Sequence, residues 1–146
     1  MKAQIFDQTK FLIIILVAAL LSTSCVTIQK NPVSGKKRIF GYTWEKEVEI
    51  GKQADGEIIA QYGLYDNQEL STYVEELGQQ LLEVSHMQRE GTDAKFRNTP
   101  FTFRVLDSPV VNAFALPGGY VYVTRGLMSH LENEAQLAVV LGHEIG

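Results

Sequence analysis

The residue types best suited to chemistry lie at the end of the chain. His143-Glu144-Ile145-Gly146 matches the first four positions of the pattern H-E-x-x-H. In a helix, two histidines four residues apart lie about 40° from each other around the axis and one turn apart along it, so both can bind the same Zn²⁺. The glutamate after the first histidine lies beside the metal and can accept a proton from the attacking water. His143 is therefore a candidate metal ligand and Glu144 a candidate catalytic base.

The pair is a weak signal by itself, because the second histidine would be residue 147 and the sequence ends at Gly146. Catalytic zinc sites use about three protein ligands and one open position. One imidazole does not hold the metal against water, so we expect this polypeptide alone to be inactive. On these residues alone, a solvated His-Glu pair near the end of a helix remains the alternative.

The sequence predicts a helix over residues 133–146, and this helix must position the His143-Glu144 pair. Asn133 is expected to cap it, with Gln136 at the third helical position as in a capping box. The expected apolar face consists of Leu137, Val140, Leu141 and Ile145. Because the helices that would cover this face lie beyond the sequence, we expect the face to lack packing partners and the polypeptide to be poorly stable.

The segment before this helix predicts a β-hairpin. Aromatic and β-branched residues indicate strands at residues 101–106 and 120–124. Another run starts at Val110 and ends at Pro117-Gly118-Gly119, where the chain can turn into the strand 120–124. We expect a short helical turn at residues 127–131 after the hairpin.

Two earlier helices are predicted as scaffold, over residues 43–62 and 67–85. Thr43 is suited to cap the first helix, although two glycines weaken its pattern. Apolar residues in the second helix follow the i, i+3, i+4, i+7 spacing. Nothing on either helix indicates a catalytic role, and the polar residues 87–100 predict a surface loop. The fold class is therefore α+β, mainly helical with a small β-sheet.

Residues 1–24 predict a lipoprotein signal peptide. Lys2 and Lys10 precede an unbroken apolar run of 11 residues, which is shorter than the roughly 20 residues of a membrane-spanning helix. A basic start, a short apolar run and small residues after it are typical of a secretory signal. We expect this segment to be removed during export.

Cys25 is the only cysteine, which excludes a disulfide within the chain. It follows Ser22-Thr23-Ser24 in a segment that resembles a bacterial lipobox, so we expect its thiol to be acylated and to anchor the protein to a membrane. Ordinary signal cleavage is the alternative. Val26 next to the cysteine, rather than an aspartate, favours the outer membrane, with the protein facing the periplasm. Residues 25–42 are then an acylated cysteine followed by a linker.

The charge balance excludes one class of partner. The chain has 13 Lys and Arg residues against 17 Asp and Glu residues, a net charge of −4 at pH 7. Nucleic-acid-binding domains usually carry a basic surface, so we expect no nucleic-acid partner.

Two segments in combination resemble the M48 family of zinc metallopeptidases. One is Asn112-Ala113-Phe114-Ala115-Leu116-Pro117-Gly118-Gly119 with its flanking residues, and the other is Gly142-His143-Glu144-Ile145-Gly146 with the helix before it. Asn31-Pro32-Val33-Ser34-Gly35 and residues 45–63 are similar to the N-terminal part of the family's bacterial periplasmic lipoprotein branch. The resemblance implies a zincin-like metallopeptidase domain that is incomplete at its C-terminus, with residues 43–146 as its N-terminal part.

The resemblance also implies a site and its partners. His143 matches the first zinc ligand and Glu144 the catalytic base, while a second histidine and a later glutamate beyond Gly146 would complete the site for one Zn²⁺. The hairpin over residues 112–124 matches the segment that borders the active-site cleft, where an edge strand can bind an extended peptide, with residues 112–119 as the candidate binding residues. The alternative is that the hairpin is simply part of the small sheet. The implied substrates are misfolded or unassembled proteins of the bacterial envelope.

A second hypothesis fits the same hairpin. A non-catalytic, chaperone-like periplasmic lipoprotein could bind peptides through residues 112–119 without cleaving them. The two hypotheses differ in what the gene encodes after Gly146. A histidine codon there favours the peptidase, and a stop codon favours the binding protein.

Overall fold

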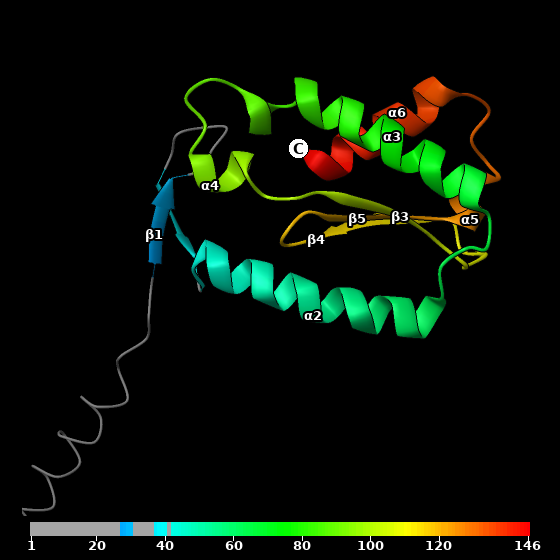
Figure 1. Cartoon of the computed structure of the whole chain (residues 1–146), viewed down its shortest axis with the longest axis horizontal. Helices are drawn as coiled ribbons and strands as arrows, with labels where there is room; N and C mark the ends of the chain where they lie inside the picture. Colours follow the sequence, from blue (N-terminus) through cyan, green and yellow to red (C-terminus); the bar gives the residue numbers. More distant parts are fainter. Residues whose placement is uncertain (1–26, 31–36, 41) are drawn as a thin grey trace, which may run out of the picture.

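The computed structural model describes residues 27–30, 37–40 and 42–146 (Figure 1). In chain order the elements are β1 (Thr27–Lys30), β2 (Lys37–Phe40), α2 (Trp44–Tyr62), α3 (Gln68–Val84), the 3-10 turn η1 (His86–Gln88), α4 (Ala94–Arg97), β3 (Thr102–Leu106), β4 (Ala113–Leu116), β5 (Tyr120–Thr124), α5 (Arg125–Met128) and α6 (Glu134–Ile145). The expected signal peptide and Cys25 lie outside the described residues. The segment for which the sequence predicts a linker holds the antiparallel pair β1 and β2.

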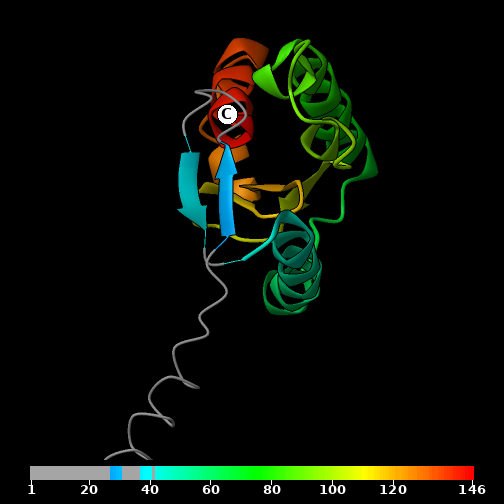
Figure 2. The same cartoon turned by 90° about the vertical axis from the view of Figure 1, so that its left-hand side faces the viewer.

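Three layers build the main body. The sheet has the strand order β3-β5-β4, with β5 parallel to β3 and antiparallel to β4. Helices α3 and α6 cover one face of this sheet and α2 covers the other, as both views show (Figures 1 and 2). The predicted hairpin is confirmed, because Leu116 pairs with Tyr120 around the turn at residues 117–119. Helices on both sides of a small mixed sheet confirm the α+β class.

The hydrophobic core lies between the sheet and the helices α3 and α6. Its buried members are Val74, Leu77, Phe103, Val105, Val121, Val123, Leu137 and Leu141. Leu137 and Leu141 on α6 are only 2% and 0% exposed. The expectation that the apolar face of this helix lacks packing partners is therefore wrong: α3 and the sheet supply them within the described part of the chain.

A polar cluster joins α2 to the opposite face of the sheet. The Asp55 carboxylate accepts two hydrogen bonds from Arg104, from Nε at 2.9 Å and from Nη2 at 3.0 Å. It accepts a third from the Tyr122 hydroxyl at 2.6 Å. The ring of Tyr122 stacks on Phe114 with their centroids 4.9 Å apart. Asp55 thus connects α2 to β3 and β5 directly, and to β4 through the stacked rings.

Glycines allow the layers to approach closely. A Cβ atom on Gly51 of α2 would lie 1.7 Å from the carbonyl oxygen of Pro117, so α2 packs directly on the hairpin turn. A Cβ atom on Gly78 of α3 would lie 2.5 Å from the ring of Phe103. The turn itself needs glycine, because Gly118 and Gly119 have φ values of 87° and 88°.

The predicted helix caps are confirmed by hydrogen bonds. Thr43, predicted as a cap, accepts from the backbone of the first turn of α2. Asn67 caps α3 in the same way, although no cap was predicted there. The Asn133 side chain accepts from the Gln136 backbone N–H at 3.1 Å. The Gln136 side chain, however, accepts from the Glu132 N–H instead of closing the capping box on Asn133.

Two segment boundaries differ from expectation. The predicted loop 87–100 contains most of η1 and all of α4, because Ser85 and Asp93 cap these short turns with their side chains. Strand β4 starts at Ala113 and not at Val110, since the Val110 carbonyl bonds the Thr124 hydroxyl rather than a strand neighbour. The short helix after the hairpin is α5, two residues earlier than expected.

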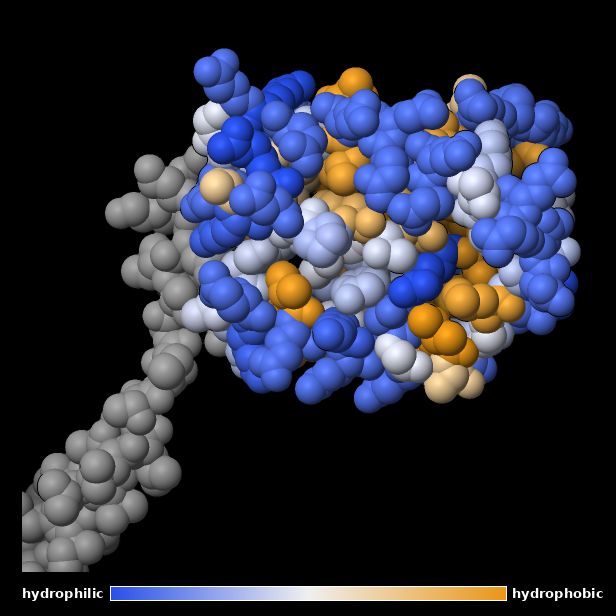
Figure 3. All heavy atoms as spheres, in the orientation of Figure 1, coloured by the Kyte–Doolittle hydropathy of each residue, from blue (hydrophilic) through white to orange (hydrophobic). Residues whose placement is uncertain are grey.

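The surface is mixed in polarity. On the face drawn in Figure 3, apolar side chains reach the surface in separate spots among polar ones. Scattered apolar residues of this kind are normal for a folded domain. Among the described residues, no helix combines the length and apolarity that crossing a membrane requires.

Candidate active site

Helix α6 gives His143 and Glu144 different surroundings. Successive residues of a helix are about 100° apart, so Glu144 lies about 60° from the fully buried Leu141, whereas His143 lies about 160° from it. The structure agrees with this geometry: His143 is exposed and Glu144 is half-buried. Both residues lie in the last turn of α6, which ends at Ile145.

A cavity of about 250 Å³ lies beside Glu144. Five segments contribute to it: the start of α2, the region of η1 and α4, residue 101, the turn of the hairpin with the strand residues beside it, and the end of α6. Its lining residues are Trp44, Glu47, Met87, Phe96, Phe101, Ala115, Leu116, Pro117, Gly118, Gly119, Val121, Glu144 and Ile145. Glu144 therefore lies against the same cavity as the hairpin turn.

The predicted substrate segment divides between the two faces of the sheet. Ala115, Leu116 and the turn at residues 117–119 line the cavity with Glu144. Asn112 and Ala113 do not line it, and Phe114 stacks on Tyr122 on the α2 face. His143 is also absent from the lining. The structure thus brings Glu144 together with the second half of the predicted segment.

Strand β4 is an edge of the three-stranded sheet. The Thr124 N–H donates to the Asn112 carbonyl oxygen at 3.1 Å, which makes these two residues a hydrogen-bonded pair. Bonded and non-bonded pairs alternate along antiparallel strands. The backbone N–H and C=O groups of Ala113 and Ala115 therefore point away from β5, toward an edge that no strand of the described residues occupies, where another extended chain can pair with them.

One wall of the cavity is an aromatic unit that the sequence did not reveal. The Trp44 indole N–H donates to the Thr99 hydroxyl at 3.2 Å, and that hydroxyl donates to the Lys95 carbonyl at 2.8 Å. The Trp44 ring meets the Phe96 ring edge to face, with centroids 4.6 Å apart. From its sequence, α2 is predicted as scaffold. The sequence feature that could have indicated the role of α2 is Gly51. This glycine lets the helix pack closely on the hairpin turn, and that packing brings Trp44 to the cavity.

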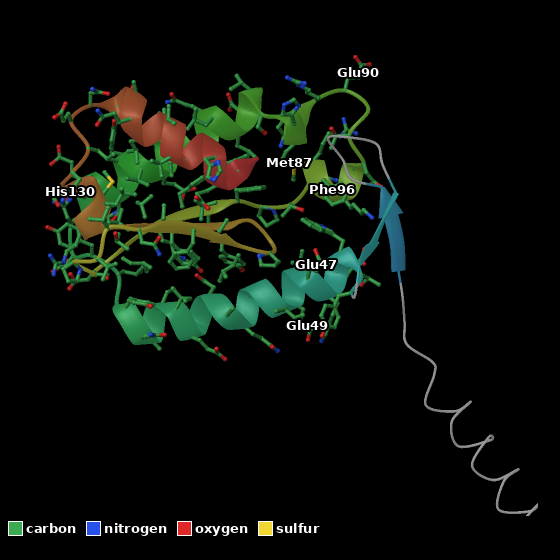
Figure 4. The ribbon with its side chains drawn as sticks, turned by 180° about the vertical axis from the view of Figure 1, so that it is seen from behind. Glu47, Glu49, Met87, Glu90, Phe96 and His130 are labelled. Atoms are coloured by element: carbon green, nitrogen blue, oxygen red, sulfur yellow. The ribbon has the colours of Figure 1, made fainter. Side chains whose placement is uncertain are left out.

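Glu47 adds a second carboxylate to the lining. Figure 4 shows Glu47 on the side of α2 that faces Phe96 and Met87, and Glu49 on the opposite side. Burial raises the pKa of the Glu47 carboxyl above its usual value, and the nearby Lys95 charge acts in the opposite direction. The cavity therefore has mostly apolar walls and two acidic groups, Glu47 and Glu144.

The donor set for a metal is incomplete within the described residues. They contain no group of three or more His, Cys, Asp or Glu side chains arranged to hold a metal ion. His143 offers one exposed imidazole, whereas a catalytic zinc site uses about three protein ligands. The described residues alone therefore do not fit a zinc ion, and His143 fits only as one ligand of a larger set.

Comparison with known proteins places the chain in a family. Residues 72–146 match the model of "Peptidase family M48". The chain is 30% identical over 116 residues to the mitochondrial metalloendopeptidase OMA1 of Schizosaccharomyces pombe, covering 77% of this chain and 32% of that protein. It is 33% identical over 100 residues to the beta-barrel assembly-enhancing protease of Escherichia coli (strain K12), covering 68% and 19%.

A third relative supports the same assignment. The putative beta-barrel assembly-enhancing protease of Vibrio cholerae is 40% identical over 76 residues, covering 52% of this chain and 14% of that protein. The chain thus spans less than a third of the length of each of these three relatives. The family match includes α6 with its His-Glu pair, the hairpin and most of α3. The chain belongs to peptidase family M48.

Proposed function

We propose that the complete gene product is a zinc-dependent metalloendopeptidase that cleaves peptide bonds in proteins of the bacterial envelope. The observation that carries this proposal is the position of Glu144. It lines the same cavity as Ala115 of the edge strand β4, so a peptide paired with β4 would run along the cavity that holds its carboxylate. Membership of a peptidase family supports the same chemistry.

Each residue of the pair has a separate role in this proposal. Glu144 accepts a proton from the attacking water and delivers it to the leaving amine. His143 donates one imidazole to the metal, and further ligands come from outside the described residues. Zinc, when bound, supplies Lewis-acid activation of the water and the scissile carbonyl. The 146-residue polypeptide alone, with this one imidazole, is then inactive.

The proposed substrates are misfolded or unassembled envelope proteins. An edge strand recognises a peptide through its backbone, and an unfolded segment exposes backbone N–H and C=O groups that can pair with it. Two of the relatives are named beta-barrel assembly-enhancing proteases, which supports a substrate class in the envelope. The free backbone groups of Ala113 and Ala115 provide the pairing positions.

We also propose that Cys25 is acylated and tethers the protein to the outer membrane, facing the periplasm. The support is the lipobox-like sequence before Cys25 and the Val26 that follows it. Labelling with a radioactive fatty acid tests the anchor. Incorporation is expected in the wild type and not in Cys25→Ala; equal incorporation in both would contradict it.

Substitution of Glu144 in the complete gene product tests the activity. Glu144→Gln should abolish cleavage of an unfolded protein and leave zinc binding intact, because the amide cannot accept the proton. The control is Glu132→Gln, an exposed carboxylate just before the same helix, which should cleave normally. Retained cleavage in Glu144→Gln would remove Glu144 from its role.

The non-catalytic alternative makes different predictions. Peptide binding through residues 112–119 without any cleavage by the wild type would favour a chaperone-like lipoprotein. The gene sequence gives an independent test, since the peptidase proposal expects a histidine codon directly after Gly146. A stop codon at that place would favour the binding protein.

A further inference from the structure

We propose that the cavity beside Glu144 is a specificity pocket that takes one large apolar side chain of the peptide, with Trp44, Met87 and Phe96 as its determinants. The inference rests on the proposed function, because it names the side chain that the site selects. These three residues come from α2, η1 and α4, outside the His-Glu pair and the hairpin. Figure 4 shows Met87 and Phe96 on the same side of the molecule, facing Glu47 across the space between them.

The size and walls of the cavity suit a single side chain. Its volume is about 250 Å³, whereas sites for small-molecule ligands are usually about 300–1,000 Å³. Other apolar side chains line the cavity together with Trp44, Met87 and Phe96, namely Phe101, Leu116, Val121 and Ile145. Burying a large aliphatic or aromatic side chain among them contributes binding energy in proportion to the apolar area removed from water.

The cavity reaches the edge strand β4 at Ala115 and Leu116. Ala115 lines it, and the backbone groups of Ala115 point toward the edge where a peptide can pair. In recognition by strand addition, backbone bonds hold the peptide and pockets select alternate side chains. A peptide paired with β4 therefore presents a side chain directly at the mouth of the cavity.

The aromatic wall is held in place before any peptide binds. Trp44 is fixed by its hydrogen bond to Thr99 and by its edge contact with Phe96. Gly51 holds α2 against the carbonyl of Pro117, so the backbone that carries Trp44 cannot move away without opening the turn contact. A rigid wall loses little conformational entropy on binding and so discriminates well between side chains.

The charges at the cavity disfavour acidic side chains. Glu47 and Glu144 both line it, and among the described residues Lys95 of α4 is the basic group acting on Glu47. A substrate carboxylate would lie near two acidic groups in a mostly apolar setting, where like charges repel strongly. Rejection of Asp and Glu is therefore a second expected property of the pocket.

The test measures kcat/KM of the complete gene product on a peptide series. Each position beside the scissile bond is varied among Leu, Phe, Ala, Lys and Glu. We expect one position at which Leu or Phe exceeds Ala by about tenfold or more, and at which Glu is the poorest. Trp44→Ala should reduce this preference about tenfold, whereas Tyr42→Ala should not, because Tyr42 is 57% exposed and outside the lining.

Glu47 and Glu49 provide a matched pair for the charge effect. Glu47→Gln should raise kcat/KM for the Glu-containing peptide, relative to that for the Leu-containing peptide, severalfold. Glu49→Gln should leave it unchanged, because Glu49 faces away from the cavity and bonds Lys46 in solvent. Cleavage without any apolar preference, or a preference unchanged in Trp44→Ala, would overturn the pocket and leave the proposed peptidase intact.

If no peptide is cleaved, the peptidase proposal fails. The pocket can still be tested, by measuring peptide binding. Trp44 is the only tryptophan of the 146 residues. Its fluorescence is obtained as the difference between the wild type and Trp44→Phe, a conservative variant that keeps an aromatic ring. A Leu-containing peptide should change this signal and the matched Glu-containing peptide should not. An equal change in the Trp44 fluorescence with both peptides, or no change with either peptide, would refute the pocket.

Discussion

The hydroxyl of Tyr122 donates a 2.6 Å hydrogen bond to the Asp55 carboxylate, joining the middle of β5 to the middle of α2. Tyr122 is fully buried, and burial together with this bond raises the pKa of its phenol above its usual value. Asp55 is one of two buried residues of α2, and the other is Gly51. The helix is therefore held on the sheet by a carboxylate and a glycine contact more than by an apolar stripe.

Loss of the Asp55 charge should destabilise the fold. Asp55→Asn leaves Arg104, whose side chain is only 26% exposed, without its counter-charge, so we expect a loss of about 3 kcal/mol in the free energy of unfolding. Tyr122→Phe removes one hydrogen bond to the carboxylate and should cost about 2 kcal/mol. Urea denaturation measures both values.

A surface ion pair gives the control for Asp55. Asp107 pairs with Arg125, but their side chains are 52% and 42% exposed. Asp107→Asn should therefore cost less than about 1 kcal/mol. A cost for Asp55→Asn no larger than that for Asp107→Asn would show that the Asp55 cluster does not hold α2 on the sheet.

Two glycines of α2 should respond oppositely to the same substitution. Gly51→Ala places a methyl group against the Pro117 carbonyl, and because backbone lies on both sides we expect a loss of about 2 kcal/mol or more. A Cβ atom on Gly56 meets nothing within 4 Å, so Gly56→Ala should gain about 0.5–1 kcal/mol from helix propensity. Thermal unfolding of the two variants compares the signs directly, and a gain for Gly51→Ala would contradict the contact.

The Glu47 carboxylate should make stability depend on pH. Burial raises its pKa in the folded state, so folding favours the protonated form. Its contribution is complete in acid below the pKa of the unfolded chain and is lost as the pH rises through the higher folded pKa. Glu47→Gln should therefore unfold at higher urea concentration than the wild type at pH 7, and the difference should shrink as the pH falls. Glu49→Gln, which removes a solvent-exposed carboxylate from the same helix, is the control variant.

Local signals explain the elements that were predictable. Thr43 and Asn133 each accept a hydrogen bond from a residue three positions later, so the sequence around each of these predicted caps was sufficient. Pro117-Gly118-Gly119 forces a turn by its backbone preferences alone. The periodicity of α6 predicted which face carries Leu137 and Leu141, although the partners of that face in α3 had to be seen.

Features built from distant residues were not predictable. Asp55 is separated from Arg104 by 49 positions and from Tyr122 by 67, and a carboxylate in a helix ordinarily faces solvent. The cavity wall joins Trp44, Met87 and Phe96 from three elements whose meeting depends on how α2 packs on the turn. Hydropathy and spacing describe one element at a time, so they predicted Glu144 as a candidate and did not predict the aromatic wall of the cavity that it lines.

The affinity for zinc should be much lower in the polypeptide that ends at Gly146 than in the complete gene product. Residues 26–146 offer His143 without a cluster of further donors in the described part of the chain, so calorimetry should detect no 1:1 binding at micromolar zinc. His143→Ala should therefore leave the titration of this polypeptide unchanged. In the complete gene product the same substitution should weaken zinc binding and abolish cleavage if His143 is the ligand that we propose. Tight 1:1 binding by residues 26–146 would mean that this part of the chain assembles a metal site by itself, and the ligands would then have to be sought within it.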